Sequence, residues 1–211
     1  MRKPATPFLC GATILAAGAS SRMGQPKPLL AWGEHTVIGH LTSLYRRLAG
    51  QVRVVCRADD APLLAELDRI GVPPSDRVFN LEAASGMFSS VKVALQQPGW
   101  REGTTHIVLA LVDQPQIDPE SIARLLEAAR SNPGRILLPL YEGRRRHPIV
   151  FPVVLAPLIA GNARFETLRD ALHAHHESVI ALQVADPGLS TDLDTPAQYD
   201  AAVKRFLPDP P

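Results

Sequence analysis

The stretch Leu15-Ala-Ala-Gly-Ala-Ser-Ser-Arg-Met-Gly-Gln-Pro-Lys-Pro-Leu-Leu30 decides the fold of this chain. It begins at the end of an apolar run, Phe8 to Ala17, which predicts a first buried strand, and it becomes a loop of small residues with two cations, Arg22 and Lys27. Gly, Ala and Ser leave the backbone N–H groups open to a ligand, and successive N–H groups form a nest for anions. Two cations in such a loop suit a polyphosphate. The alternative is an ordinary βα turn with two solvated charges, since small residues are also common in turns.

Two familiar phosphate-binding loops do not match this stretch. A Walker loop needs Gly, four residues and then Gly-Lys-Ser/Thr. Here five residues separate Gly18 from Gly24, and Lys27 follows Gln25-Pro26 instead of the second Gly. The dinucleotide fingerprint G-x-G-x-x-G is absent from the sequence. The sequence therefore disfavours a P-loop NTPase and a dinucleotide-dependent dehydrogenase.

Length and composition indicate one α/β domain. The chain has 211 residues, 45% of them hydrophobic, which allows one complete core. We expect this domain to cover residues 1–206, followed by a proline-rich tail at 207–211. The net charge of +1 gives no strong attraction to nucleic acid or to a membrane surface, so neither is expected as a partner. Cys10 and Cys56 lie in apolar runs, which predicts core thiols in a reducing cytoplasm.

Strand and helix patterns alternate along the chain. Strands are expected at 52–56, 77–80, 106–112, 136–140 and 178–184, with a charged turn at 142–147 and a short extended piece at 148–151. Helices are expected between Thr36 and Gly50 and at 61–70, 85–97, 119–130, 164–176 and 196–206. This alternation predicts a doubly wound, mostly parallel, Rossmann-like sheet. Ligands bind such sheets beyond the carboxyl ends of the strands, where we expect the first loop, Asp113 and the loop after Asn80.

Acidic residues are expected at the same edge of the sheet. Asp113 directly follows the apolar run at 106–112, and Asp192 and Asp194 precede the last helix. Mg²⁺ takes oxygen ligands and prefers a few carboxylates plus phosphate, so Asp113 and one of the other two suit a single ion. In an extended segment the side chains of Asp192 and Asp194 point to one side. The alternative is that these carboxylates only cap a turn and a helix.

Four motifs in this order make the chain resemble the MobA-like nucleotidyltransferases. They are Leu15-Ala-Ala-Gly-x-Ser-x-Arg-Met-Gly-x-x-Lys-x-Leu-Leu30, Asp113-Gln-Pro115, His147-Pro148 and Asp192-x-Asp-Thr-Pro196. The chain is most similar to the MocA branch, the molybdenum cofactor cytidylyltransferases. The resemblance implies a fold of the nucleotide-diphospho-sugar transferase type. It also implies a Mg²⁺-dependent transfer of a nucleoside monophosphate from an NTP to a phosphorylated acceptor, with release of pyrophosphate.

The resemblance further implies roles for the residues at matching positions. The nucleotide would be bound by Leu15, Ala16, Ala17, Gly18, Arg22, Lys27, Gly86 and Ser90. Arg22, Lys27 and Asp113 would be catalytic, and Asp113 and Asp194 would hold the metal, with Asp194 favoured over Asp192. Charge repulsion opposes the attack of one anion on another, and a metal ion with two fixed cations offsets it. Positioning and electrostatics suffice for such a transfer, as in phosphoryl transfer, so no covalent nucleophile is expected.

Two features favour CTP over GTP. The segment Gly86-Met-Phe-Ser-Ser-Val-Lys92 resembles the Gly-x-Ser-Ser-Ser-Leu segment of the cytidylyltransferase branch. Ala17 stands where guanylyltransferase relatives usually have a second Gly. A hydroxyl or a backbone group can contact the edge of the small pyrimidine. The alternative is that Ser89 and Ser90 only cap the following helix.

The acceptor side departs from the family pattern. Val112 stands where the branch commonly has Gly, and Ala160-Gly-Asn-Ala-Arg-Phe-Glu-Thr-Leu168 replaces the Gly-Asp-x-Gly-Ala-Arg pattern of the molybdopterin enzymes. The acceptor is therefore either molybdopterin or another compound such as a sugar or alcohol phosphate. Arg144-Arg-Arg-His147 suits an acceptor phosphate, or it is a solvated turn.

Protein partners and a third function class complete the expectations. A molybdoenzyme or a chaperone is the protein partner that the resemblance implies. A nucleotide-binding regulatory protein without turnover would keep the first loop but would not need two acidic metal positions. The joint presence of Arg22, Lys27, Asp113 and Asp194 argues against that class.

Overall fold

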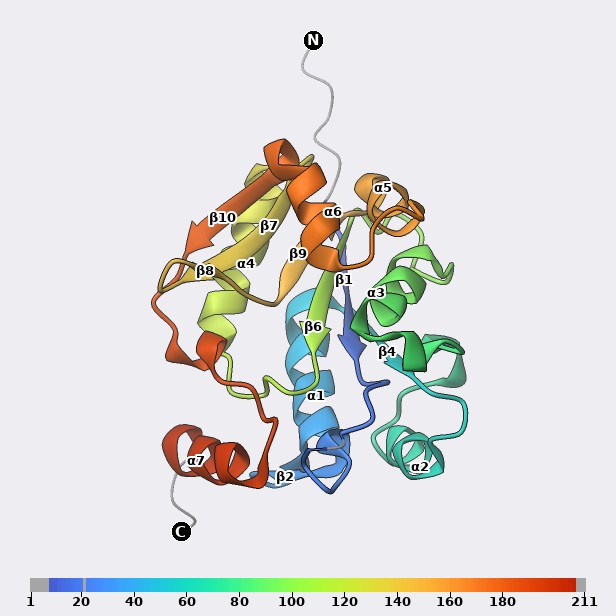
Figure 1. Cartoon of the computed structure of the whole chain (residues 1–211), viewed down its shortest axis with the longest axis vertical. Coiled ribbons are helices and arrows are strands. Elements are labelled where there is room, and N and C mark those ends of the chain that lie inside the picture. The colour runs from blue at the N-terminus through green and yellow to red at the C-terminus, as the bar shows by residue number, and fades with distance from the viewer. Residues whose placement is uncertain (1–7, 21, 208–211) are drawn as a thin grey trace.

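The computed structural model describes residues 8–20 and 22–207, so the part of the predicted tail beyond Leu207 lies outside the described residues. Among the described residues, eight strands form one sheet in the order β10-β7-β9-β6-β1-β4-β5, with β8 paired to β7 (Figure 1). These strands are β1 (Cys10–Leu15), β4 (Gln51–Cys56), β5 (Arg77–Phe79), β6 (His106–Leu111), β7 (Ile136–Tyr141), β8 (Arg144–Arg145), β9 (Ile149–Pro152) and β10 (Val179–Gln183). A separate antiparallel pair joins β2 (Ala31–Trp32) to β3 (His35–Thr36).

The sheet is mostly parallel, as the alternating pattern predicted. β1 pairs in parallel with β4 and β6, β4 with β5, and β10 with β7. β9 runs antiparallel between β6 and β7, and the short β8 also pairs antiparallel with β7. The expected extended piece at 148–151 is therefore a reversed strand inside the sheet, and the expected turn at 142–147 is a hairpin.

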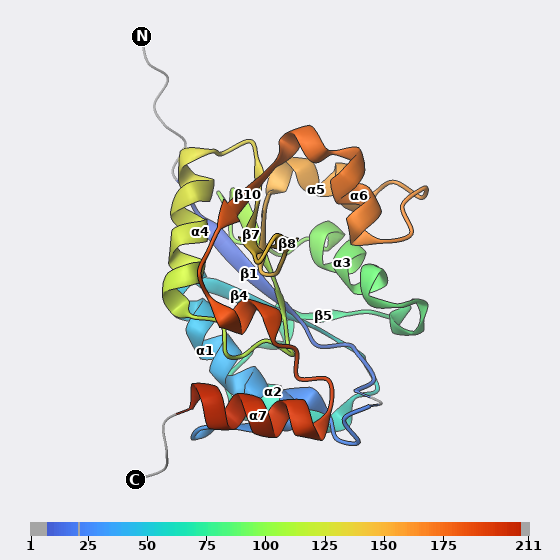
Figure 2. The same ribbon diagram turned by 60° about the vertical axis from the view of Figure 1, so that its left-hand side comes forward.

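Helices cover both faces of the sheet, so the fold is a doubly wound α/β sheet. Figure 2 shows α1 (Val37–Ala49) and α4 (Pro119–Ser131) on one side, and α3 (Met87–Gln96), α5 (Ala156–Ala160) and α6 (Leu168–Ala174) on the other. Leu41, Leu63 and Leu125 belong to the first core cluster, which includes α2 (Ala61–Arg69). Val91, Ile159 and Leu172 belong to the second. No helix among the described residues is long and apolar enough to cross a membrane.

Helix caps place several boundaries where the sequence predicted them. Thr36 accepts a hydrogen bond from the Gly39 N–H at the start of α1, and Asp118 accepts one from the Glu120 N–H at the start of α4. Thr195 caps α7 (Pro196–Phe206) in the same way, through the Gln198 N–H. Each cap satisfies a donor that the helix leaves unpaired.

The predicted helix at 164–176 is wrong in its bounds. α6 starts only at Leu168, because Thr167 and Asp170 form a capping box that ends the preceding turn. The helix ends at Ala174, and His176 belongs to a separate short turn of 3-10 helix, His176–Ser178. The short α5 before this segment was not predicted.

Candidate active site

A pocket of about 350 Å³ lies where the parallel strands β1 and β6 end. Its walls are the loop after β1, residues 111–113 at the end of β6, the start of α3, and Asp194. Open α/β sheets bind their ligands at this carboxyl edge. The volume falls within the range of about 300–1,000 Å³ that is common for small-molecule sites.

The structure gathers nearly all of the sequence-predicted site residues around this pocket. The lining includes Leu15, Ala17, Gly18, Arg22, Lys27, Gly86, Ser90, Asp113 and Asp194. Ala16 is not among the lining residues. It is buried and its N–H donates to the Val55 carbonyl at 2.8 Å, so it extends the pairing of β1 with β4.

Four charged side chains meet at one end of the pocket. The Lys27 ammonium donates to Asp194 Oδ1 at 2.5 Å and to Asp113 Oδ2 at 3.2 Å. Arg22 Nη2 lies 2.8 Å from Asp194 Oδ2. The Lys27 side chain is 12% exposed, whereas that of Arg22 is 71% exposed. Lys27 is therefore held in place, and Arg22 reaches in from the solvent side.

The pKa values of Asp113 and Asp194 are shifted in opposite directions. Burial raises the pKa of Asp113, although the Lys27 ammonium opposes this change and the neighbouring Asp192 and Asp194 add to it. The hydrogen bond from Lys27 lowers the pKa of Asp194, and Arg22 contributes in the same direction. Both cations thus favour the anionic form of Asp194, while burial of Asp113 opposes its charge and Lys27 favours it.

The donor set at Asp113 and Asp194 fits a hard divalent cation. Asp113 Oδ1 is buried and has no hydrogen-bond partner among the described residues. Such an oxygen gains from a cation, because an unpaired buried acceptor costs free energy. No cluster of three or more His, Cys, Asp or Glu able to hold a metal occurs in the described part of the chain. Two carboxylates with phosphate and water as the other ligands are the usual arrangement for Mg²⁺.

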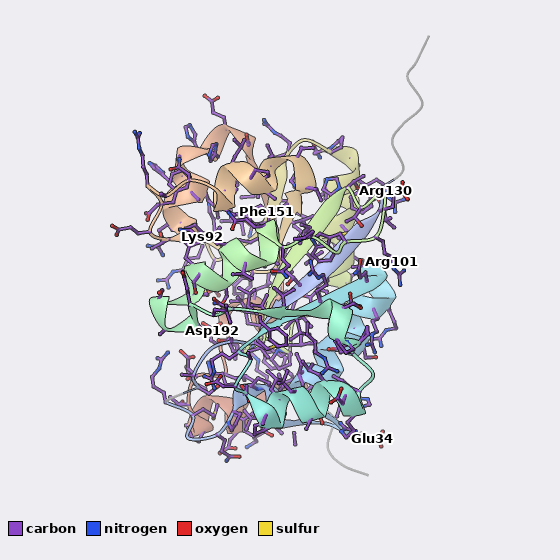
Figure 3. All side chains as sticks on the ribbon, turned by 90° about the vertical axis from the view of Figure 1, so that its right-hand side faces the viewer. Glu34, Lys92, Arg101, Arg130, Phe151 and Asp192 are labelled. Carbon is purple, nitrogen blue, oxygen red and sulfur yellow. The ribbon has the colours of Figure 1, made fainter. Side chains whose placement is uncertain are left out.

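Asp192 and Asp194 have different partners, unlike the expectation for an extended segment. Asp192 Oδ1 accepts a hydrogen bond from Gln114 Nε2 at 2.8 Å. The chain bends between the two residues, since the Asp194 N–H donates to the Asp192 carbonyl at 3.0 Å. In the view of Figure 3, Asp192 lies left of the centre of the molecule, and Arg101 and Arg130 lie at its right-hand edge. Asp194, and not Asp192, lines the pocket.

The loop after β1 offers backbone donors to the pocket. Ser20 has a positive φ of 50°, and its hydroxyl accepts a hydrogen bond from the Lys27 N–H at 3.1 Å. Its carbonyl accepts one from the Met23 N–H at 3.0 Å. Gly18 and Ala19 are exposed, and within the described ranges no hydrogen bond uses their N–H groups. The loop is therefore folded by Ser20 with part of its backbone open, as the anion nest requires.

The opposite wall is built around a buried asparagine that the sequence analysis did not assign to the site. Asn80 Nδ2 donates to the hydroxyls of Ser89 at 2.8 Å and Ser90 at 2.9 Å. Ser89 in turn donates to the Gly86 carbonyl at 2.8 Å. Neither serine hydroxyl caps α3 at its first N–H groups, so the capping alternative does not describe them. Asn80 directly follows a strand at the carboxyl edge of the sheet, and this position is the signal in the sequence that indicated a place near the site.

The basic segment before β9 lies outside the pocket lining. Arg144 and Arg145 are exposed in β8, and the Arg146 N–H donates to the Pro139 carbonyl at 2.9 Å. Burial lowers the pKa of His147 to about 4, and the nearby Asp192 carboxylate opposes this shift only in part. Val112, the departure noted after β6, does line the pocket.

Comparison with known proteins identifies the family. The chain is a doubly wound α/β protein with a pocket at the carboxyl edge in which acidic and basic side chains are paired. The model of the MobA-like NTP transferase domain matches residues 12–179, so the chain belongs to this family. It is a nucleotidyltransferase.

Its relatives carry different names. The chain is 33% identical to the purine catabolism protein PucB of Bacillus subtilis (strain 168), over 92% of this chain and 96% of that protein. It is 31% identical to the nicotine blue oxidoreductase of Paenarthrobacter nicotinovorans, over 88% and 92%. It is 30% identical to the molybdenum cofactor cytidylyltransferase of Escherichia coli (strain K12), over 92% and 95%.

Solved structures share the fold. A nucleotidyl transferase from Methanothermobacter thermautotroptrophicus superposes with a TM-score of 0.74 at 18% identity, over 94% of this chain and 98% of that one. Rv0371C of Mycobacterium tuberculosis, solved in complex with manganese, gives a TM-score of 0.66 at 22% identity, over 94% and 100%.

Proposed function

We propose that this chain transfers CMP from CTP to a phosphorylated small-molecule acceptor, with Mg²⁺ as cofactor and pyrophosphate as the second product. The observation that carries the proposal is the contact of Lys27 with both Asp113 and Asp194 in the pocket at the carboxyl edge. One site thus combines acidic side chains for a cation with basic side chains for a polyphosphate.

Lys27 and Arg22 bind the triphosphate in this proposal. Lys27 is held close to the reaction centre by two carboxylates, and the exposed Arg22 closes on the outer phosphates. Both cations offset the negative charge that builds on the leaving pyrophosphate. The open N–H groups of Gly18 and Ala19 add neutral donors to the same anion. The oxygen that attacks belongs to the acceptor phosphate, so no protein nucleophile is required.

Asp113 and Asp194 would hold the metal. When bound there, Mg²⁺ supplies charge neutralisation and a fixed orientation for the phosphates. The unpartnered Asp113 Oδ1 supports this assignment on this chain's own residues. Rv0371C, which has the same fold, was solved in complex with manganese, and this supports a divalent ion at the site.

The base is proposed to lie between the start of α3 and the loop after β1. Ala17, Gly86 and Ser90 line that part of the pocket. Ser89 and Ser90 are oriented by Asn80, so their hydroxyls have defined directions. The E. coli relative named for cytidylyl transfer supports CTP as the nucleotide.

Molybdopterin is the first acceptor to test, and a sugar or alcohol phosphate is the second. The relatives at 31% and 33% identity have names that mention no molybdenum cofactor, which supports including other acceptors. The departure of residues 160–168 from the molybdopterin pattern supports the same choice.

The test is a screen of pyrophosphate release. Purified protein with Mg²⁺ is given each of the four NTPs together with molybdopterin, sugar phosphates or alcohol phosphates. We expect release that depends on CTP, on Mg²⁺ and on one acceptor class, and its loss in Asp113→Asn. A preference for GTP would overturn the base assignment. Metal-independent release would overturn the role of the carboxylates.

A further inference from the structure

The two carboxylates of the site come from loops that are far apart in the sequence. Asp113 lies in the segment 112–118 between β6 and α4, and Asp194 lies in the segment 184–195 between β10 and α7. Loops of this kind are mobile unless other groups hold their backbone. A displacement of 1 Å at a reacting centre costs up to about 10²-fold in rate. Something in the fold must therefore set the spacing of Asp113 and Asp194.

Buried side-chain amides join these two loops. Gln116 is 7% exposed, and its Nε2 donates to the Gly188 carbonyl at 2.8 Å and to the Thr191 carbonyl at 2.6 Å. Gln114 is 5% exposed and donates to Asp192 Oδ1. The Leu193 N–H donates to the Asp113 carbonyl at 3.0 Å. A hydrogen bond therefore connects Leu193, the residue before Asp194, directly to the backbone of Asp113.

A buried carboxylate and a close backbone approach complete this junction. Asp186 is 6% exposed and accepts hydrogen bonds from the Gly188 N–H at 2.8 Å and the Asp118 N–H at 3.0 Å. A Cβ at Gly188 would lie 2.6 Å from the Gln116 carbonyl oxygen, so only glycine allows the loops to approach so closely. Leu189 and Leu193 are fully buried and anchor the loop in the core.

We infer that Gln116 is a positioning residue for the metal site, because its amide fixes the Gly188–Thr191 backbone against the loop that carries Asp113. The inference rests on the proposed metal-dependent function. Within the described residues, the hydrogen bonds of the Gln116 side chain go to backbone carbonyls and not to either carboxylate, and Gln116 is not among the pocket-lining residues. It acts through the backbone, and such outer partners typically change metal affinity or activity by about 10–100-fold.

A matched control exists at the opposite edge of the sheet. Gln51 is 9% exposed and starts β4, and its Nε2 donates to the Gly99 carbonyl at 3.0 Å and to Asp76 Oδ1 at 2.8 Å. Its Oε1 also accepts the Arg101 N–H at 2.9 Å. Gln51→Met therefore removes at least as many buried hydrogen bonds as Gln116→Met, but far from the site.

The experiment titrates Mn²⁺ into wild type, Gln116→Met and Gln51→Met, with free Mn²⁺ followed by electron paramagnetic resonance. We expect Gln116→Met to bind Mn²⁺ about tenfold more weakly, with CTP binding in EDTA unchanged. Gln51→Met should lower the melting temperature, and its dissociation constant for Mn²⁺ should equal that of the wild type. If Gln116→Met does not fold, Asp186→Asn serves instead, because it disturbs the same loop through Gly188 and Asp118.

The outcomes separate the inference from the proposed function. If a folded Gln116→Met variant has the wild-type dissociation constant for Mn²⁺ and the wild type is active, the inference about Gln116 is overturned and the proposed function stands. An equal weakening in Gln51→Met also overturns it, because the effect would then be general loosening. A wild type that neither binds Mn²⁺ nor releases pyrophosphate overturns the proposed function, and the inference with it.

Discussion

Replacement of Lys27 by methionine should change metal binding and turnover in opposite directions. The Lys27 ammonium contacts Asp194 at 2.5 Å and Asp113 at 3.2 Å, and these are the carboxylates proposed to hold the cation. The ammonium and a divalent ion therefore compete for the same oxygens. Lys27→Met keeps most of the side-chain length and removes the charge, so a metal no longer has to displace it.

The free energy of the Lys27 ion pairs, which a metal has to displace, can be estimated from the exposure of the three side chains. An exposed ion pair contributes about 0.2–1 kcal/mol, whereas breaking a buried pair costs about 3–5 kcal/mol. Lys27 is 12% exposed and the carboxylates are 23% and 24% exposed, so these pairs fall between the two cases. After a discount for solvent screening, about 1–2 kcal/mol remains, which corresponds to roughly 5–30-fold tighter metal binding in Lys27→Met.

Turnover should fall in the same variant. The ammonium is proposed to stabilise charge on the departing pyrophosphate, and the loss of one such donor costs about 10²–10³ in kcat. A purely structural role for Lys27 would not move metal affinity and kcat in opposite directions.

The assay is a Mn²⁺ titration without nucleotide, paired with the pyrophosphate-release rate. Lys27→Arg keeps a cation and should bind Mn²⁺ nearly as wild type does. Lys92→Met removes a different lysine, one whose ammonium lies over the Phe88 ring at 4.8 Å, and should alter neither quantity. An equal or weaker Mn²⁺ affinity in Lys27→Met would refute the competition, and an unchanged rate would remove Lys27 from the triphosphate site.

Three further predictions concern the metal-binding role of Asp113, the choice of nucleotide base and the stability of the fold at acid pH. Asp113→Asn should abolish Mg²⁺-dependent pyrophosphate release with an unchanged circular dichroism spectrum, and full activity would end the metal role of Asp113. CTP should raise the melting temperature more than GTP or ATP, since ligand at 100 times its Kd stabilises the native state by about 2.7 kcal/mol; a larger shift with GTP would contradict the choice of base. The imidazole of His147, with its pKa lowered from 6.5 to about 4 by burial, stays neutral in the fold while the unfolded chain takes up a proton. Stability should therefore fall by up to about 3 kcal/mol as the pH drops from about 6.5 to 4, and His147→Gln should flatten this dependence in urea unfolding; an unaltered slope would show that His147 does not cause it.

The parallel part of the fold could be predicted because each of its elements carries a local signal. β6 is a continuous apolar run, and Asp118 with Pro119 marks the start of α4 at the residue where it begins. β9 has no comparable signal for its direction. A four-residue strand has the same composition whether it runs parallel or antiparallel, and pairing with β6 and β7 decides the matter. α5 has five residues, too few for a helical period to show.

In the site, too, residues with a local sequence signal could be predicted, whereas contacts between residues far apart in the sequence could not. Lys27 and Asp113 could be expected at one edge because the carboxyl ends of parallel strands meet there, and Asp194 could be expected beside them from the family resemblance. The role of Gln116 could not be expected, since its partners lie 72 and 75 positions along the chain. Asn80 was placed at the right edge, but its hydrogen bonds to Ser89 and Ser90 depend on how α3 packs.

The residues of the proposed nucleotide site are fixed by more contacts than the segment at 160–168, which departs from the molybdopterin pattern. Lys27 contacts both Asp113 and Asp194, and the buried Gln114 and Gln116 hold the loops that carry these carboxylates. In contrast, residues 161–164 and 166–167 are exposed on the segment between α5 and α6. Substitutions on an exposed segment change stability little, whereas changes to a buried network are costly. If the exposed segment binds the acceptor, substitutions in it would change the acceptor and leave the nucleotide site intact.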